Sequence, residues 1–238
     1  MIRVWKFLHS VRFFIAAGIL VVAAIVVFWP DHSDSTAAIG AVKKAAPVEY
    51  NPAVEALLKQ AADAQDKGRL TDAVTIYEKV VVLAPDFAPV YLKLGQIYFR
   101  LGSPSKAEEI YLKAIDLGLN DPDVFLYLGY IREVRSDFDQ AMAYYAKAEF
   151  AGSRNAVLYF NMGNVHARQD HKDKALECFK RAVILDPKYM DAFVNLAIVS
   201  AQTGEYADAQ YYLEKAEKLG YDAPVEFKAG LAKELKKK

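Results

Sequence analysis

The chain has 238 residues, which is enough for one or two ordinary domains with a sizeable core. Its 30 basic and 30 acidic residues cancel, which argues against nucleic-acid binding through a strongly basic surface. A single cysteine and four scattered histidines exclude a disulfide framework and a multi-cysteine zinc site, so we expect no metal and no cofactor.

The first thirty residues differ from the rest of the chain. Residues 1–12 carry three basic side chains and no acid, and residues 13–29 are an apolar run of 17 residues without a charge. As a helix this run would be about 25 Å long, the short end of what spans a bilayer. We therefore expect one transmembrane helix over residues 13–29.

The charges beside this segment predict its orientation. By the positive-inside tendency, residues 1–12 are cytoplasmic and the bulk of the chain lies in the periplasm of a bacterial-type cell. The alternative is a cleaved signal peptide, which would leave a soluble periplasmic protein. Residues 30–53 are rich in Ala, Ser, Asp and Pro without apolar periodicity, which predicts a flexible linker with ends about 25 Å apart.

From Val54 onward the sequence repeats with a period of 34 residues. In frames that begin at residues 54, 88, 122, 156 and 190, position 20 is always alanine, and position 8 is always glycine or alanine. Positions 4 and 24 are aromatic in four frames of five. Positions 4, 7, 8 and 11 share one face of a helix, and positions 20, 24 and 27 share one face of a second helix. Small residues at positions 8 and 20 would let the two helices approach closely.

This pattern resembles the tetratricopeptide repeat, a helix-turn-helix unit of 34 residues. The resemblance covers residues 54–223 and implies an all-α fold, a right-handed solenoid of five repeats: 54–87, 88–121, 122–155, 156–189 and 190–223. Departures from the pattern are local, such as Ser136 and Asp170 in place of a turn glycine at position 15. An amphipathic segment over residues 224–238 predicts a helix that caps the last repeat.

Sequence motifs for catalysis are absent. There is no glycine-rich phosphate loop, no Gly-x-Ser-x-Gly and no His-Glu-x-x-His. His166 and Cys178 are interpreted as packing residues, and Glu108 and Glu109 as part of a solvated helix face. We therefore predict that the protein is not an enzyme.

The resemblance also implies a binding surface. In proteins of this family the first helices of successive repeats line a concave groove, which positions 2, 5, 6, 9, 12 and 13 commonly face. Tyrosines there supply contact area with little rotamer entropy, and asparagines can pair with the backbone of an extended peptide. The residues mapped to this groove are Lys59, Lys93, Gln96, Phe99, Arg100, Tyr127, Tyr130, Phe160, Asn161, Asn164, Arg168 and Asn195, with Glu133 also at a facing position.

Two alternatives weigh against this groove. Lys, Asn and Gln also serve simply to keep such a surface soluble, and the two tyrosines could instead pack on neighbouring helices.

Some family members clamp a C-terminal carboxylate with lysine, asparagine and arginine side chains. Asn164 and Asn195 match the asparagine pair of that clamp, but Phe160 stands where a lysine is needed and no sixth repeat supplies the remainder, so we predict no clamp.

These observations together predict a membrane-anchored adaptor. It would bind a segment of another protein in the groove and help to assemble or stabilise an envelope complex. A self-associating scaffold is the first alternative, with a second copy of the chain as partner. A non-catalytic regulator of an enzyme complex is the second.

Overall fold

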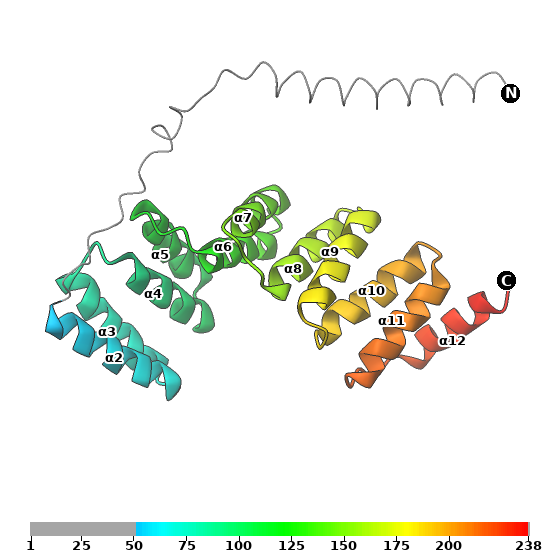
Figure 1. Cartoon of the computed structure of the whole chain (residues 1–238), viewed down its shortest axis with the longest axis horizontal. Helices are drawn as coiled ribbons and strands as arrows, with labels where there is room; N and C mark the ends of the chain where they lie inside the picture. The colour runs from blue at the N-terminus through cyan, green and yellow to red at the C-terminus, as the bar shows by residue number, and fades with distance from the viewer. Residues whose placement is uncertain (1–50, 238) are drawn as a thin grey trace, which may run out of the picture. The chain divides into compact units, whose positions relative to one another are not determined.

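The computed structural model describes residues 51–237, which form α-helices joined by short loops and contain no strand. The helices follow one another as a row of hairpins in chain order (Figure 1). The predicted all-α repeat solenoid is thereby confirmed. The eleven helices of this part of the chain are α2 (Pro52–Asp66), α3 (Leu70–Leu83), α4 (Ala88–Arg100), α5 (Pro104–Asp116), α6 (Pro122–Val134), α7 (Phe138–Phe150), α8 (Ala156–Arg168), α9 (Lys172–Leu185), α10 (Met190–Gln202), α11 (Tyr206–Lys218) and α12 (Val225–Leu235).

Each helix pair corresponds to one 34-residue frame, from α2 and α3 in the first to α10 and α11 in the fifth. The two helices of a pair pack along each other, and the second helix of each pair also packs against the first helix of the next. Helix α12 lies in the segment predicted as a cap. Its Leu231 is buried against α11, with Phe227 beside it, so it covers the last apolar face.

The predicted transmembrane segment, residues 13–29, lies outside the described residues, as does nearly all of the predicted linker. Between residues 51 and 237, no helix combines the length and the apolar character that crossing a membrane requires. The anchor therefore stays a prediction from the sequence.

Small residues lie where the two helices of a pair come closest. The alanine at position 20 is fully buried in all five pairs. A Cβ atom on Gly95 would lie 2.4 Å from a ring carbon of Tyr111, and the equivalent glycines of the next two pairs meet Tyr145 and Phe179 in the same way. A larger residue would displace these rings, so the aromatic residue at position 24 requires the small one at position 8.

The turn inside each pair contains one residue with a positive φ angle. Gly68, Gly102 and Gly204 supply it in three pairs. Ser136 (φ 61°) and Asp170 (φ 59°) adopt the same left-handed conformation in the other two. Because this conformation costs a non-glycine residue about 1 kcal/mol, packing of the two helices imposes the turn on these residues.

Two kinds of loop join one pair to the next. After α5, α7 and α11, position 31 is a glycine with positive φ, and position 32 is not proline. After α3 and α9, position 31 is Ala84 or Asp186 with negative φ, and Pro85 or Pro187 follows. Where position 32 is not proline, a glycine in the left-handed backbone conformation thus ends the second helix.

Candidate protein-binding surface

An aromatic cluster joins the first helices of the second and third repeats. The Phe99 ring on α4 lies 5.3 Å from that of Tyr127 and 5.6 Å from that of Tyr130, both on α6. Tyr127 is half-buried and stacks on Tyr111 of α5, with ring centroids 5.5 Å apart. Tyr130 is 39% exposed. These three candidate residues therefore form one contiguous surface, in which Tyr130 is the most accessible ring.

A pocket of about 390 Å³ opens beside this cluster. It is lined by Phe99, Gly102, Pro104, Ser105, Tyr130, Ile131, Val134 and Arg135. The lining is mostly apolar, which suits a bulky apolar side chain. The exposed Val134 is not among the predicted groove residues, although it stands at position 13 of the frame, one of the positions expected to face the groove.

Ion pairs of a buried carboxylate join the two sides of this pocket, α5 and the end of α6. Glu108 of α5 is buried and pairs with Arg132 of α6 and with Arg135, the residue that directly follows this helix. Arg135 also donates a hydrogen bond to the Ser105 hydroxyl oxygen at 3.1 Å. The prediction of a solvated face is wrong for Glu108, because its position faces the next repeat, and holds for its exposed neighbour Glu109.

Two basic candidates lie on α4 near the cluster. Lys93 and Arg100 are exposed, and Gln96 between them in sequence is half-buried. Burial and the charge of Asp121 raise the pKa of Asp123 on α6, and the Lys93 charge opposes this rise. Burial likewise raises the pKa of Tyr127, and the Arg100 charge opposes it. The exposed Lys93 and Arg100 thus act on α6 side chains beside the aromatic cluster, where Asp121 and Asp123 are also present.

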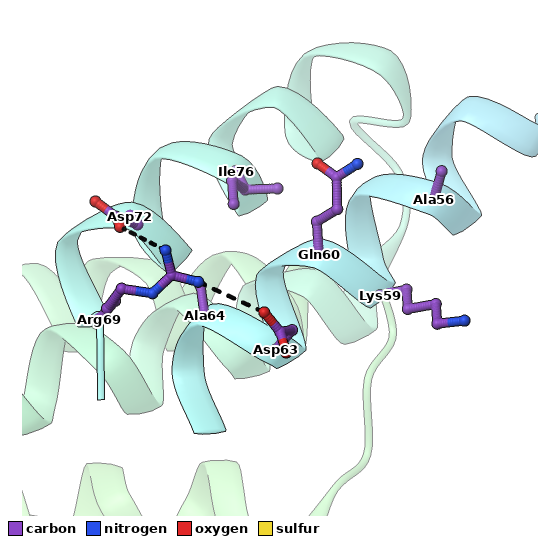
Figure 2. Close-up of a pocket in the computed structure, with 8 residues that line it drawn as sticks. All are labelled: Ala56, Lys59, Gln60, Asp63, Ala64, Arg69, Asp72 and Ile76. Carbon is purple, nitrogen blue, oxygen red and sulfur yellow. Dashed lines mark hydrogen bonds and ion pairs between the residues drawn. The ribbon is translucent and has the colours of Figure 1, made fainter. Parts of the chain in front are cut away.

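Lys59 belongs to a different surface, on the first helix pair. A pocket of about 670 Å³ lies between α2 and α3. In Figure 2, Gln60 points toward α3, and Lys59 is directed away from the ion-paired residues. Asp63 and Arg69 lie 3.5 Å apart across this pocket. The structure therefore separates Lys59 from the aromatic cluster.

Comparison with the later repeats explains this polar pocket. Position 10 is the exposed Asp63 in the first repeat, and it is a buried aliphatic residue in the other four: Ile97, Ile131, Val165 and Val199. Position 3 follows the same rule, with Ala56 exposed and its four equivalents buried. The pocket in Figure 2 is thus the face on which a preceding repeat would pack, and its charged lining favours contact with water.

The three candidate asparagines are largely engaged within the fold. Asn161 is 5% exposed and lies beside the hydroxyl of Tyr145, which donates a hydrogen bond to the buried Glu133 at 2.7 Å. Asn195 Nδ2 donates to Asn164 Oδ1 at 2.9 Å. Asn161 and Glu133 are therefore not open to a ligand, contrary to expectation, and the other two amides already pair with each other.

The last two candidates also make contacts within the repeats. The Phe160 ring lies 5.8 Å from that of Phe179 and 4.8 Å from that of Tyr189. The exposed Arg168 guanidinium lies 5.9 Å from the ring centre of Phe138. Neither residue joins the aromatic cluster, so the candidates of the fourth and fifth repeats form no single site with those of the second and third.

The chemistry of the remaining polar groups is limited. Across residues 51–237, no three His, Cys, Asp or Glu side chains come together as a metal site would require. Burial raises the pKa of the Cys178 thiol to about 11, so the thiol is protonated at neutral pH. Burial also lowers the pKa of His166, whose buried Nδ1 has no hydrogen-bond partner in the described chain.

Three family profiles match this repeated architecture. A TPR repeat profile matches residues 66–102, and a tetratricopeptide repeat profile matches residues 92–156. The profile of the cilia and flagella-associated protein 70 middle TPR-like domain matches residues 125–230. The chain is a tetratricopeptide-repeat protein. A search of curated protein sequences found no match for this repeat protein.

Solved structures share its fold. MamA is 23% identical with a TM-score of 0.60, over 67% of this repeat protein and 93% of MamA. YrrB, described as a TPR protein with an unusual peptide-binding site, is 24% identical with a TM-score of 0.58, over 76% and 91%. PilW, described as a widely conserved type IV pilus biogenesis factor, is 21% identical with a TM-score of 0.64, over 78% and 87%. At these identities the likeness concerns the fold.

Proposed function

We propose that this tetratricopeptide-repeat protein is an adaptor that binds a segment of another protein on the surface of α4 and α6. The observation that carries the proposal is the exposed Tyr130 beside an apolar pocket between Phe99 and Val134. Accessible tyrosines next to apolar pockets are typical anchors of protein interfaces. The exposed bases Lys93 and Arg100 on α4 favour a segment with a bulky apolar residue near an acidic one.

We further propose that the adaptor is anchored in a membrane. The support is the sequence of residues 13–29, an uncharged apolar run that follows three basic residues. This arrangement places the repeats in the periplasm, where the adaptor helps to assemble or stabilise an envelope complex. The likeness to PilW, a pilus biogenesis factor, agrees with such a role.

A self-associating scaffold is less well supported. Stacking of repeats end to end would bury the polar face of Gln60, Asp63 and Arg69 against another copy, and burial of charged groups is costly even when they are paired with each other. A non-catalytic regulator of an enzyme complex would use the same surface on α4 and α6. It differs from the adaptor only in the nature of its partner.

Photo-crosslinking in cells tests the binding surface. A photoreactive amino acid is placed at Tyr130 and, as a control, at Tyr211, which is 53% exposed on α11. We expect Tyr130 to capture one dominant foreign protein that Tyr211 does not capture. Capture of the chain itself at Tyr130 would instead favour the scaffold, and equal capture at both positions would contradict the surface.

A double substitution provides the matching loss of function. Tyr130→Ser with Val134→Ser removes the apolar rim of the pocket, and should reduce partner capture at least about tenfold. Both side chains are exposed, so the helical circular dichroism should be unchanged. Undiminished capture by this variant would rule out the pocket as the anchor point.

A further inference from the structure

The second helices of the third and fourth repeats end in protruding apolar residues. Phe150, the last residue of α7, is 93% exposed, and Ile184 near the end of α9 is 76% exposed. Both occupy position 29 of the 34-residue frame, so they project from equivalent places on consecutive repeats. The proposed binding surface on α4 and α6 uses neither residue.

Each of these apolar residues is accompanied by a base. Arg154 and Lys188 are exposed at position 33 of the same two repeats. No other repeat combines the two features, because the residues at positions 29 and 33 are Val82 and Asp86, Asp116 and Asn120, or Lys218 and Asp222. We call Phe150, Arg154, Ile184 and Lys188 the outer patch.

Two of the four residues, Arg154 of the third repeat and Ile184 of the fourth, line the same pocket. A pocket of about 620 Å³ is lined by residues from the end of α7, the loop that contains Arg154, and the end of α9 that contains Ile184. At its base Glu149 of α7 pairs with Arg181 of α9 at 2.9 Å. This pairing offsets the charge of Glu149. Asp186 accepts a hydrogen bond from the backbone N–H of Lys188 at 2.9 Å and stays an exposed acid beside the patch.

We propose that the outer patch docks on an anionic lipid surface. Phe150 and Ile184 would enter the interfacial region, and Arg154 and Lys188 would meet the negatively charged headgroups. Apolar side chains flanked by bases are typical of surfaces that lie on membranes, and each base near an anionic leaflet strengthens binding. The proposal also rests on the proposed anchor, because a flexible linker of the length that the sequence predicts would keep the repeats within about 25 Å of the bilayer.

Charge argues against a second copy of the chain as the occupant. Two outer patches facing each other would bring four bases together, and like charges across an interface are repulsive. A membrane rich in anionic lipid supplies the complementary charge. It also offers an apolar layer for the exposed Phe150 and Ile184.

Vesicle flotation with residues 50–238 tests this docking. This part is suited to the test because its buried core, from Val54 to Leu231, is built entirely from its own residues. We expect binding to vesicles of phosphatidylcholine mixed with phosphatidylglycerol, weakened by salt, and little binding to phosphatidylcholine alone. Equal, negligible flotation with both vesicle types would overturn the proposal.

Matched variants locate the contact. Phe150→Ser with Ile184→Ser should reduce vesicle binding at least about tenfold, and Arg154→Ser or Lys188→Ser about fivefold each. The control is Val82→Ser, which removes an 80% exposed apolar residue from the same frame position and should bind like the wild type. Equal loss in the control, or unchanged binding of the double variant, would contradict the patch.

Two further readouts separate this proposal from its rivals. Self-association of residues 50–238 that is abolished by Phe150→Ser would assign the patch to a second copy and overturn lipid docking. Partner capture at Tyr130 is measured independently in the Phe150 and Ile184 variant, where we expect it to persist in detergent. Loss of partner capture at Tyr130 and loss of vesicle binding are therefore measured separately, so the adaptor proposal and the lipid-docking proposal can fail independently.

Discussion

At the scale of single residues, backbone strain is concentrated at two turn positions. Ser136 holds a φ of 61° where three other repeats have glycine. Ser136→Gly relieves this strain and should raise the free energy of unfolding by about 0.5 kcal/mol after the entropy cost of glycine. The control is Ala143→Gly on the exposed face of α7, which should lower it by about 1 kcal/mol. Urea denaturation measures both, and a destabilised Ser136→Gly protein would contradict this account of the turn.

A buried carboxyl makes stability depend on pH. Burial raises the pKa of Glu133 above its ordinary value of 4.5, and the hydrogen bond from Tyr145 and the charge of Arg168 offset this only in part. Because the folded pKa is the higher one, the stability contribution is full below the unfolded pKa and is lost as pH rises through the folded pKa. Glu133→Gln keeps the hydrogen-bond acceptor and has no charge. It should gain stability relative to the wild type, by about 1 kcal/mol, as pH rises through this window.

Denaturation of both proteins at a series of pH values checks this prediction. The difference in free energy of unfolding between wild type and Glu133→Gln should change only as pH rises from the pKa of Glu133 in the unfolded chain through its higher pKa in the folded protein. A constant difference at every pH would show that the carboxyl has an ordinary pKa.

At the scale of elements, one ion-pair group ties the second repeat to the third. Glu108 of α5 is buried and pairs with Arg132 of α6 and with Arg135 just after it. Glu108→Ala leaves a partly buried arginine without its partner, so the free energy of unfolding should fall by about 3 kcal/mol. The matched control Glu109→Ala removes an exposed carboxylate from the same helix and should change it by less than about 0.5 kcal/mol. Similar losses in the two variants would mean that the pair contributes nothing to the α5–α6 contact.

At the scale of the whole repeat domain, polar residues on the first helix pair disfavour the packing of another repeat domain against this end. Position 7 is Gln60 and position 10 is Asp63, where the other repeats have buried apolar residues at one or both positions. Gln60→Leu with Asp63→Ile gives this face the character of an internal one, and should make residues 50–238 associate. Sedimentation over a concentration series should show a monomer for the wild type and larger species for the variant. If the wild type already associates and the variant associates to the same extent, self-association uses a surface other than this face of the first helix pair.

The sequence by itself determined the architecture of the repeats. The 34-residue spacing of alanine, glycine and aromatic residues predicted five helix pairs, and the ten helices follow its frames, except that α2 begins at Pro52, two residues before the first frame. This succeeded because the packing of two helices in one hairpin depends on residues a few turns apart, which a short periodic pattern encodes. The same frame correctly placed Phe99, Tyr127 and Tyr130 on adjoining helices.

Only the tertiary structure decided which candidate residues are open to a partner. Asn161 and Glu133 stand at positions expected to face the groove, yet both are buried beside Tyr145, and Asn164 pairs with Asn195. The pocket beside Tyr130 likewise needs side chains from three helices. Accessibility depends on how each repeat packs on the next, and these contacts join residues about thirty positions apart that no single helix face reveals.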